Sequence, residues 1–219
     1  MYPRTVTKNS KFSEKQTMNP LKSVGGTLAS GLVLALLIVF FLPGEHVVGV
    51  QLKSVLIWFH VLAGITWIGL LYYFNFVQVP ALGEAASDEG GPGGAGIAKY
   101  IAPRALWWFR WGALATWLSG AWFLQLQGML HQAFTLGLVG PSNPYATTIG
   151  VGAWLGTIML INVWALIWPN QKKILGMVEA TAEEVAKAKN IALLASRSNT
   201  LMSIPLVMSM VGPGHGWFM

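Results

Sequence analysis

The chain has 219 residues, no cysteine, 54% hydrophobic residues and only 10% charged residues. Because soluble domains carry about 25% charged residues, this composition excludes an ordinary soluble enzyme and predicts an integral membrane protein. Without cysteine there can be no disulfide, no thiolate-ligated cluster and no covalently attached c-type haem. The net charge of +6 does not indicate nucleic-acid binding, because the Lys and Arg residues cluster between the apolar segments as they do in membrane proteins.

In chain order, a basic tail (1–23) precedes five segments that each approach the 20 or so apolar residues needed to cross a bilayer. We predict membrane spans at residues 24–43, 54–79, 105–128, 147–168 and 198–214. The third span contains Arg110, and Pro205 and Pro213 interrupt the fifth. Neighbouring helices can satisfy the carbonyls that a proline frees within a membrane. The sequence therefore predicts an all-α integral membrane helical bundle of about five transmembrane helices.

Positive charge fixes the expected orientation of these spans. If the N-terminus is cytoplasmic, 13 of the 14 Lys and Arg residues lie in or beside the inner segments, and only Lys53 lies outside. Cytoplasmic loops carry an excess of Lys and Arg, so we predict an N-in/C-out topology. Residues 40–48 offer no A-x-A cleavage site, so the first span is expected to be retained.

Two inner connections have distinct compositions. Residues 80–98 are rich in glycine and predict a flexible inner loop. Residues 175–195 alternate Glu and Lys with apolar residues, which favours an amphipathic helix on the inner membrane face.

The predicted topology gives the four histidines a common location. His46 follows the first span, His131 follows the third, and His215 ends the fifth within a Gly-Pro-Gly-His-Gly turn. His60 lies six residues into the second span, roughly 9 Å below its outer end at Ser54. All four histidines are therefore expected towards the periplasmic side.

His60 is the strongest candidate for a cofactor ligand. An ionisable residue within a span is a functional-site hypothesis by default, and neutral imidazole is a usual axial ligand of haem. Gly64 and Trp67 lie one and two turns further along the same helix face, where the glycine would let a flat macrocycle approach the backbone. The alternative is a buried histidine that only bonds to a neighbouring helix.

The other histidines carry weaker predictions. We expect His215 to be the second axial ligand of a haem, although its glycine neighbours are also typical of a C-terminal turn. His46 and His131 are more simply solvated loop residues, and all four together could form an outer-facing copper site.

Tryptophans surround the only cation predicted inside a span. Trp107, Trp108 and Trp111 bracket Arg110, a pattern typical of an aromatic belt at the inner interface with a snorkelling arginine. Pairing of Arg110 with a substrate carboxylate or a haem propionate is the less favoured alternative.

Three segments carry a resemblance to a known family: residues 59–78 (FHVLAGITWIGLLYYFNFVQ), 102–112 (APRALWWFRWG) and 197–205 (RSNTLMSIP). They resemble the N-terminal membrane domain of bacterial membrane-bound urate oxidase, also called urate hydroxylase. The resemblance implies a multi-helix membrane domain that takes part in the oxidation of urate to 5-hydroxyisourate. Fused family members carry electrons onward through a C-terminal cytochrome c domain. This chain contains no cysteine, so a cytochrome c partner would be a separate periplasmic protein.

The segment around His60 also looks like the membrane families of copper-resistance proteins and protoporphyrinogen oxidases, in which such a helix binds copper or b-type haem. Together these observations predict a redox protein of the bacterial inner membrane that binds haem b through His60 and His215. Gly64 and Trp67 would shape the haem face, and the protein would pass electrons to a cytochrome c. Two alternatives stay open: a non-enzymatic accessory subunit of a larger respiratory or photosynthetic membrane complex, and a copper-handling protein.

Overall fold

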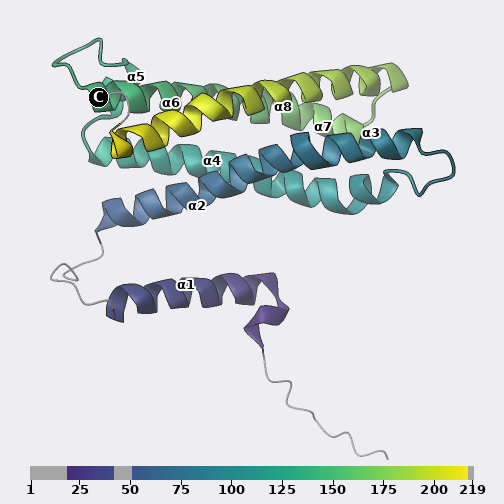
Figure 1. Cartoon of the computed structure of the whole chain (residues 1–219). Coiled ribbons are helices and arrows are strands. Elements are labelled where there is room, and N and C mark those ends of the chain that lie inside the picture. The colour runs from purple at the N-terminus through teal and green to yellow at the C-terminus, as the bar shows by residue number, and fades with distance from the viewer. Residues whose placement is uncertain (1–18, 42–50, 217–219) are drawn as a thin grey trace, which may run out of the picture. The chain divides into compact units, whose positions relative to one another are not determined.

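The structure is a computed structural model that describes residues 19–41 and 51–216, and within these ranges the chain is helical without a strand. The chain divides into two compact units, residues 1–50 and 51–219. In the first unit, a 3-10 turn (Pro20–Lys22) leads into α1 (Val24–Phe41) (Figure 1). No side chain of α1 is buried and none is charged, as expected for a helix surrounded by lipid.

The second unit is a bundle of four long rods, of which two contain a π-helical segment between two α-helices (Figure 1). The first rod consists of α2 (Leu52–Tyr72), a π-helix (Tyr73–Gln78) and α3 (Val79–Ser87), and the second of a π-helix (Ile97–Ile101) and α4 (Ala102–Leu126). The third consists of α6 (Pro144–Ile161), a π-helix (Asn162–Ile167) and α7 (Trp168–Ile174). The fourth consists of α8 (Ala182–Val211) and a 3-10 turn (Gly212–His215). The short α5 (Leu130–Phe134) lies between α4 and α6.

Packing pairs the rods into a closed bundle. The helix α2 packs along α4 and α6 along α8, while contacts between α4 and α6 and between α2 and α8 complete the ring. The buried core joins all four rods and consists of Trp67, Leu71, Phe74, Leu106, Phe109, Ala113, Met159, Val163, Ile167, Ala195 and Leu206. A glycine permits the close approach of α4 to α2, because a Cβ at Gly112 would lie only 3.4 Å from the backbone nitrogen of Trp67.

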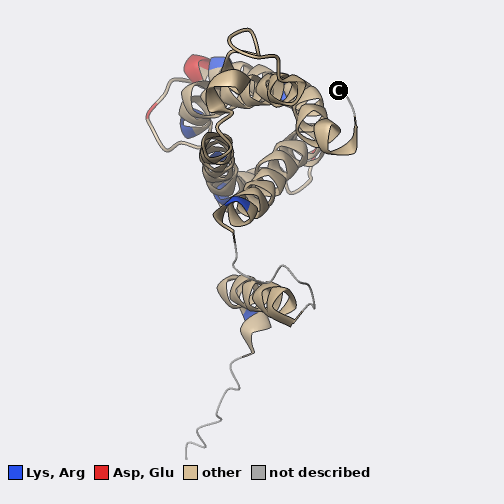
Figure 2. Cartoon of the chain, turned by 90° about the vertical axis from the view of Figure 1, so that its left-hand side faces the viewer, with Lys and Arg blue, Asp and Glu red and all other residues tan. Residues whose placement is uncertain are grey.

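The exterior of the bundle suits lipid rather than water. Large apolar side chains are exposed along every long helix, for example Ile65 at 64% and Leu201 at 71% of their maximal exposure. Viewed along the bundle, Lys, Arg, Asp and Glu form a few separate patches on otherwise uncharged helices (Figure 2). A soluble protein rarely exposes so much contiguous apolar surface, so the bilayer is the partner that this surface fits.

Four described helices are long and apolar enough to cross a membrane: Val24–Phe41, Leu52–Ser87, Pro144–Ile174 and Ala182–His215. The all-α membrane bundle predicted from the sequence is confirmed. The helix α4 covers the predicted third span and has 25 residues, but it is not among these four. Its hydropathy is lowered by Arg104, Arg110 and its tryptophans. The orientation of the bundle stays a prediction.

Two predicted segments differ in the structure. The glycine-rich stretch 80–98 is helical up to Ser87, so the irregular connection is shorter than expected. The residues expected to form an interfacial helix (175–195) and a fifth span (198–214) instead share one helix, α8, which begins at Ala182 and continues through Pro205. A reciprocal capping box starts this helix: Glu184 N–H donates to Thr181 Oγ1 (3.2 Å), and Thr181 N–H donates to Glu184 Oε2 (2.9 Å).

Candidate functional site

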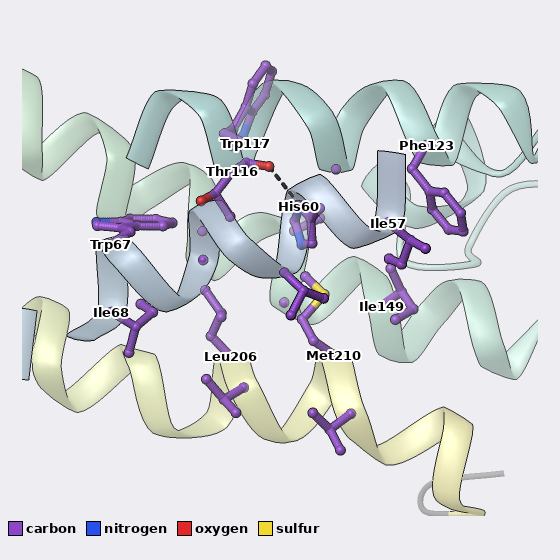
Figure 3. A pocket seen from close by; sticks show the side chains of 18 of the residues that line it. Ile57, His60, Trp67, Ile68, Thr116, Trp117, Phe123, Ile149, Leu206 and Met210 are labelled. Atoms are coloured by element: carbon purple, nitrogen blue, oxygen red, sulfur yellow. Dashed lines mark hydrogen bonds between the residues drawn. The ribbon is translucent and has the colours of Figure 1, made fainter. Parts of the chain in front are cut away.

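An apolar pocket lies among α2, α4, α6 and α8 (Figure 3), with a volume of about 650 Å³. Of the residues in 19–41 and 51–216, none that lines it is Asp, Glu, Lys or Arg, and His60 is the one histidine among them. Sites for small molecules and cofactors are concave and mostly apolar, with volumes of about 300–1,000 Å³ and few polar groups. The pocket is therefore the candidate functional site, and His60 is its principal polar group.

The backbone of α4 orients the imidazole of His60. Nδ1 of His60 lies 2.8 Å from the carbonyl oxygen of Thr116 and 3.3 Å from Ser119 Oγ (Figure 3). A carbonyl oxygen only accepts hydrogen bonds, so Nδ1 carries the hydrogen and donates it to Thr116. In the neutral ring, Nε2 then keeps its lone pair. This is the arrangement by which proteins fix the tautomer of a metal-ligating histidine.

A glycine on α4 makes room for this ring. A Cβ at Gly120 would lie 2.8 Å from Cε1 and 3.0 Å from Nδ1 of His60, closer than carbon atoms normally approach. Any larger residue at this position would displace the imidazole from its hydrogen bond. The position of His60 thus depends on a backbone acceptor and on the absence of a side chain, both supplied by α4.

The structure places all three predicted site residues of α2 in this pocket. His60, Gly64 and Trp67 line it along one helix face, as the spacing predicted. Trp67 is 2% exposed, and its Nε1 has no hydrogen-bond partner among the residues that the structure describes. Their role in binding a cofactor stays a prediction.

Neither His131 nor His215 is brought into the pocket. His215 lies exposed in the turn after α8, where its Nδ1 bonds to the carbonyl oxygen of Val211 (3.0 Å). His131 is exposed on α5, and His46 lies outside the described residues. Among the described residues, no three His, Cys, Asp or Glu side chains form a group that could hold a metal ion.

Arg110 has an aromatic partner outside the pocket. Its guanidinium carbon lies 3.6 Å from the ring centroid of Trp168 on α7, a cation–π geometry. Trp107, Trp108 and Trp111 are each more than 40% exposed. The exposed tryptophans fit the predicted aromatic belt. Arg110 packs on Trp168, and its Nη1 is buried without a hydrogen-bond partner among the described residues, so the snorkelling of this arginine stays a prediction.

The pocket residues that were not singled out from the sequence include Thr116, Gly120 and Met210. A signal for the first two exists, because Gly112, Thr116 and Gly120 recur at intervals of four on α4, a small-residue pattern typical of closely packed membrane helices. Met210 has no such signal, because the sequence alone does not show which face of α8 meets α2.

The pocket and the residues beside it fit a haem in four respects. The lone pair of His60 Nε2 is available to a metal. Beside it, a Cβ at Gly64 would have only one neighbour within 4 Å, Thr116 Cγ2 at 3.7 Å, so a flat ring could approach the backbone. Gly152 and Gly156 line the wall formed by α6. A cation for a haem carboxylate is available at Lys53, one turn before the pocket residue Ile57 on the same face of α2.

Comparison with known proteins adds one match. Residues 142–218 match the family model described as "Urate oxidase N-terminal". No curated protein and no solved structure matches the chain. The matched region contains α6, α7 and α8, and with them the segment 197–205, whereas segments 59–78 and 102–112 lie outside it. Over this C-terminal third the predicted resemblance is confirmed: the chain is similar there to the N-terminal membrane domain family of urate oxidases.

Proposed function

We propose that this protein is a urate hydroxylase-like membrane domain that binds haem b in the pocket through His60 and relays electrons to a separate cytochrome c. The observation that carries the proposal is the imidazole of His60, whose Nδ1 donates to Thr116 while Nε2 is available within an apolar pocket of suitable volume. The family match supports the membrane-domain assignment.

The chain's own residues would supply position and environment. The carbonyl oxygen of Thr116 holds the ring of His60 in one orientation, and a hydrogen bond to Nδ1 makes Nε2 a better ligand. The apolar lining excludes water, which together with the axial ligands sets the reduction potential of a haem. When bound, haem supplies reversible one-electron chemistry.

The location of the pocket suits transfer to a partner outside the membrane. His60 is eight residues from the start of α2, about 12 Å along the helix axis. In the predicted topology this end is periplasmic, and Lys53 is the one cation expected there. Oxidation of urate to 5-hydroxyisourate releases electrons that need an acceptor, and a cytochrome c that docks at this end would be within reach of the pocket.

The first experiment is an absorption spectrum of the full chain purified in detergent, oxidised and then reduced with dithionite. We expect a sharp b-type α-band on reduction. His60→Ala should abolish haem retention, whereas His131→Ala, at an exposed histidine outside the pocket, should leave the haem-to-protein ratio unchanged. Metal analysis of the same sample distinguishes iron from copper. A colourless wild-type protein, or a His60→Ala variant with a normal haem ratio, would contradict the proposal.

A second candidate is a non-enzymatic accessory subunit of a larger membrane complex, favoured by the exposed tryptophans of α4. Trp107, Trp108, Trp111 and Trp122 are all 43–53% exposed, and aromatic residues are enriched at protein interfaces. A colourless, metal-free protein that purifies with larger membrane subunits would support this function in place of the first.

A further inference from the structure

We propose that Met210 of α8, and not His215, is the second axial ligand of the haem bound by His60. This inference rests on the proposed function, because it names the partner ligand of the same site. It gives the pocket a His–Met ligand pair, a combination that proteins use for electron-transfer haems.

Met210 and His60 line the same pocket from different helices. Figure 3 shows the sulfur of Met210 on the side of α8 that faces α2, at the level of His60 along the bundle. Leu206, one turn earlier on α8, lines the pocket nearer to Trp67. A haem held from α2 by His60 would therefore meet Met210 from the opposite wall.

A glycine on α6 makes room for Met210, as Gly120 does for His60. A Cβ at Gly152 would lie 2.7 Å from Cε of Met210 and closer still to Ser209 Oγ. The thioether is thus accommodated against a bare stretch of the α6 backbone. Both candidate ligands owe their positions to a glycine on a neighbouring helix.

The other pocket residues offer few alternatives. Haem iron is bound in proteins by His, Met, Cys or Tyr, and the lining contains one His, one Met and two Tyr. The hydroxyl of Tyr72 is hydrogen-bonded to Ser203 Oγ (3.0 Å), and Tyr145 is 36% exposed. Methionine often fills irregular gaps in a core, which is the ordinary explanation for its presence. The location opposite a free imidazole nitrogen favours the ligand role.

His215 is less well placed. It follows Met210 by five residues, does not line the pocket, and lies exposed at the end of α8. To bind the same iron, its ring would have to move from the exposed turn into the bundle, and that movement would break its hydrogen bond to the carbonyl oxygen of Val211.

The test compares Met210→Leu, Met210→His and His215→Ala with wild type, and Met208→Leu is the matched control. Met208 is an exposed methionine two residues earlier on α8 that does not line the pocket. Leucine nearly conserves volume, so Met210→Leu should fold normally. Size-exclusion profiles and thermal unfolding check this for every variant.

We expect oxidised wild-type protein to show the weak far-red absorption of a sulfur–iron bond. Met210→Leu should lose this band and lower the reduction potential, because a thioether ligand raises it. Met210→His should give a low-spin spectrum without the band, and His215→Ala and Met208→Leu should match wild type.

Three results separate failure of this inference from failure of the proposed function. Wild-type protein without haem overturns both. Haem that depends on His60 but is unaffected in spectrum and potential by Met210→Leu overturns only the assignment of Met210. Loss of the low-spin spectrum in His215→Ala would likewise overturn it in favour of His215.

Discussion

Replacing Gly120 by alanine tests the geometry of the pocket most directly. The added Cβ would lie 2.8 Å from Cε1 of His60, where ordinary contacts begin at 3.4 Å, so the ring must move by about 0.6 Å. A shift of this size along the 2.8 Å bond from Nδ1 to the carbonyl oxygen of Thr116 lengthens it to about 3.4 Å, outside the usual range of about 2.7–3.2 Å, and so weakens it. Complete loss of this bond would lower the free energy of unfolding by about 1 kcal/mol, and replacing glycine by alanine within a helix raises it by about 1 kcal/mol.

Gly120→Ala should therefore unfold at nearly the wild-type temperature and yet bind haem about 10–100-fold more weakly, the usual effect of losing the group that orients a ligand histidine. Haem titration into stripped protein measures the affinity, and thermal unfolding in the same detergent measures stability. Gly83→Ala on α3 is the matched control, since its Cβ would have no neighbour within 4 Å. Unchanged haem affinity in Gly120→Ala would refute the reasoning.

Substitutions at three places test the packing of the bundle. Asn199→Ala removes two hydrogen bonds, one donated by Asn162 Nδ2 (2.9 Å) and one that Asn199 donates to a carbonyl oxygen of α6 (3.0 Å). Each loss should lower the free energy of unfolding by roughly 0.6–1.7 kcal/mol, and Asn162→Ala, which removes one bond, should lower it by about half as much. Unfolding in mixed micelles measures both. Gly150→Val should cost about 1–3 kcal/mol because its side chain meets the α5 backbone, and an unchanged melting temperature would contradict this. Trp168→Leu should lower the free energy of unfolding by about 0.5–2 kcal/mol, because it removes the cation–π contact with Arg110. A double-mutant cycle with Arg110→Met should show a coupling energy of the same size, and additive effects of the two substitutions would exclude the contact.

One face of the pocket could be predicted from the sequence because helix periodicity is a local property. Residues 60, 64 and 67 share a face of any α-helix, and a histidine within an apolar span stands out by composition alone. The structure places these three residues along one cavity. Their spacing required no knowledge of the neighbouring helices.

The rest of the site depends on contacts between helices distant in sequence. The hydrogen-bond acceptor for His60 is a backbone carbonyl 56 residues away. Every residue has a backbone carbonyl, so the residue types do not show which one accepts this bond. The importance of Gly120 and Gly152 follows from what lies opposite them, which a single sequence does not contain. The same holds for α8: Pro205 suggested an interrupted span, but packing against α6 and α7 keeps the helix continuous.

The long rods make the two ends of the bundle unequal. The 36 residues from Leu52 to Ser87 extend about 54 Å, far beyond a hydrocarbon core of about 30 Å, and even a tilt of 40° would leave several turns outside. Measured along this rod, His60 is about 12 Å from one end and about 40 Å from the other. The rate of direct electron transfer falls steeply with distance, so a group held by His60 would exchange electrons with aqueous proteins through the short end. The α3 end would lie on the opposite side of the membrane, too far from such a group for fast direct electron transfer.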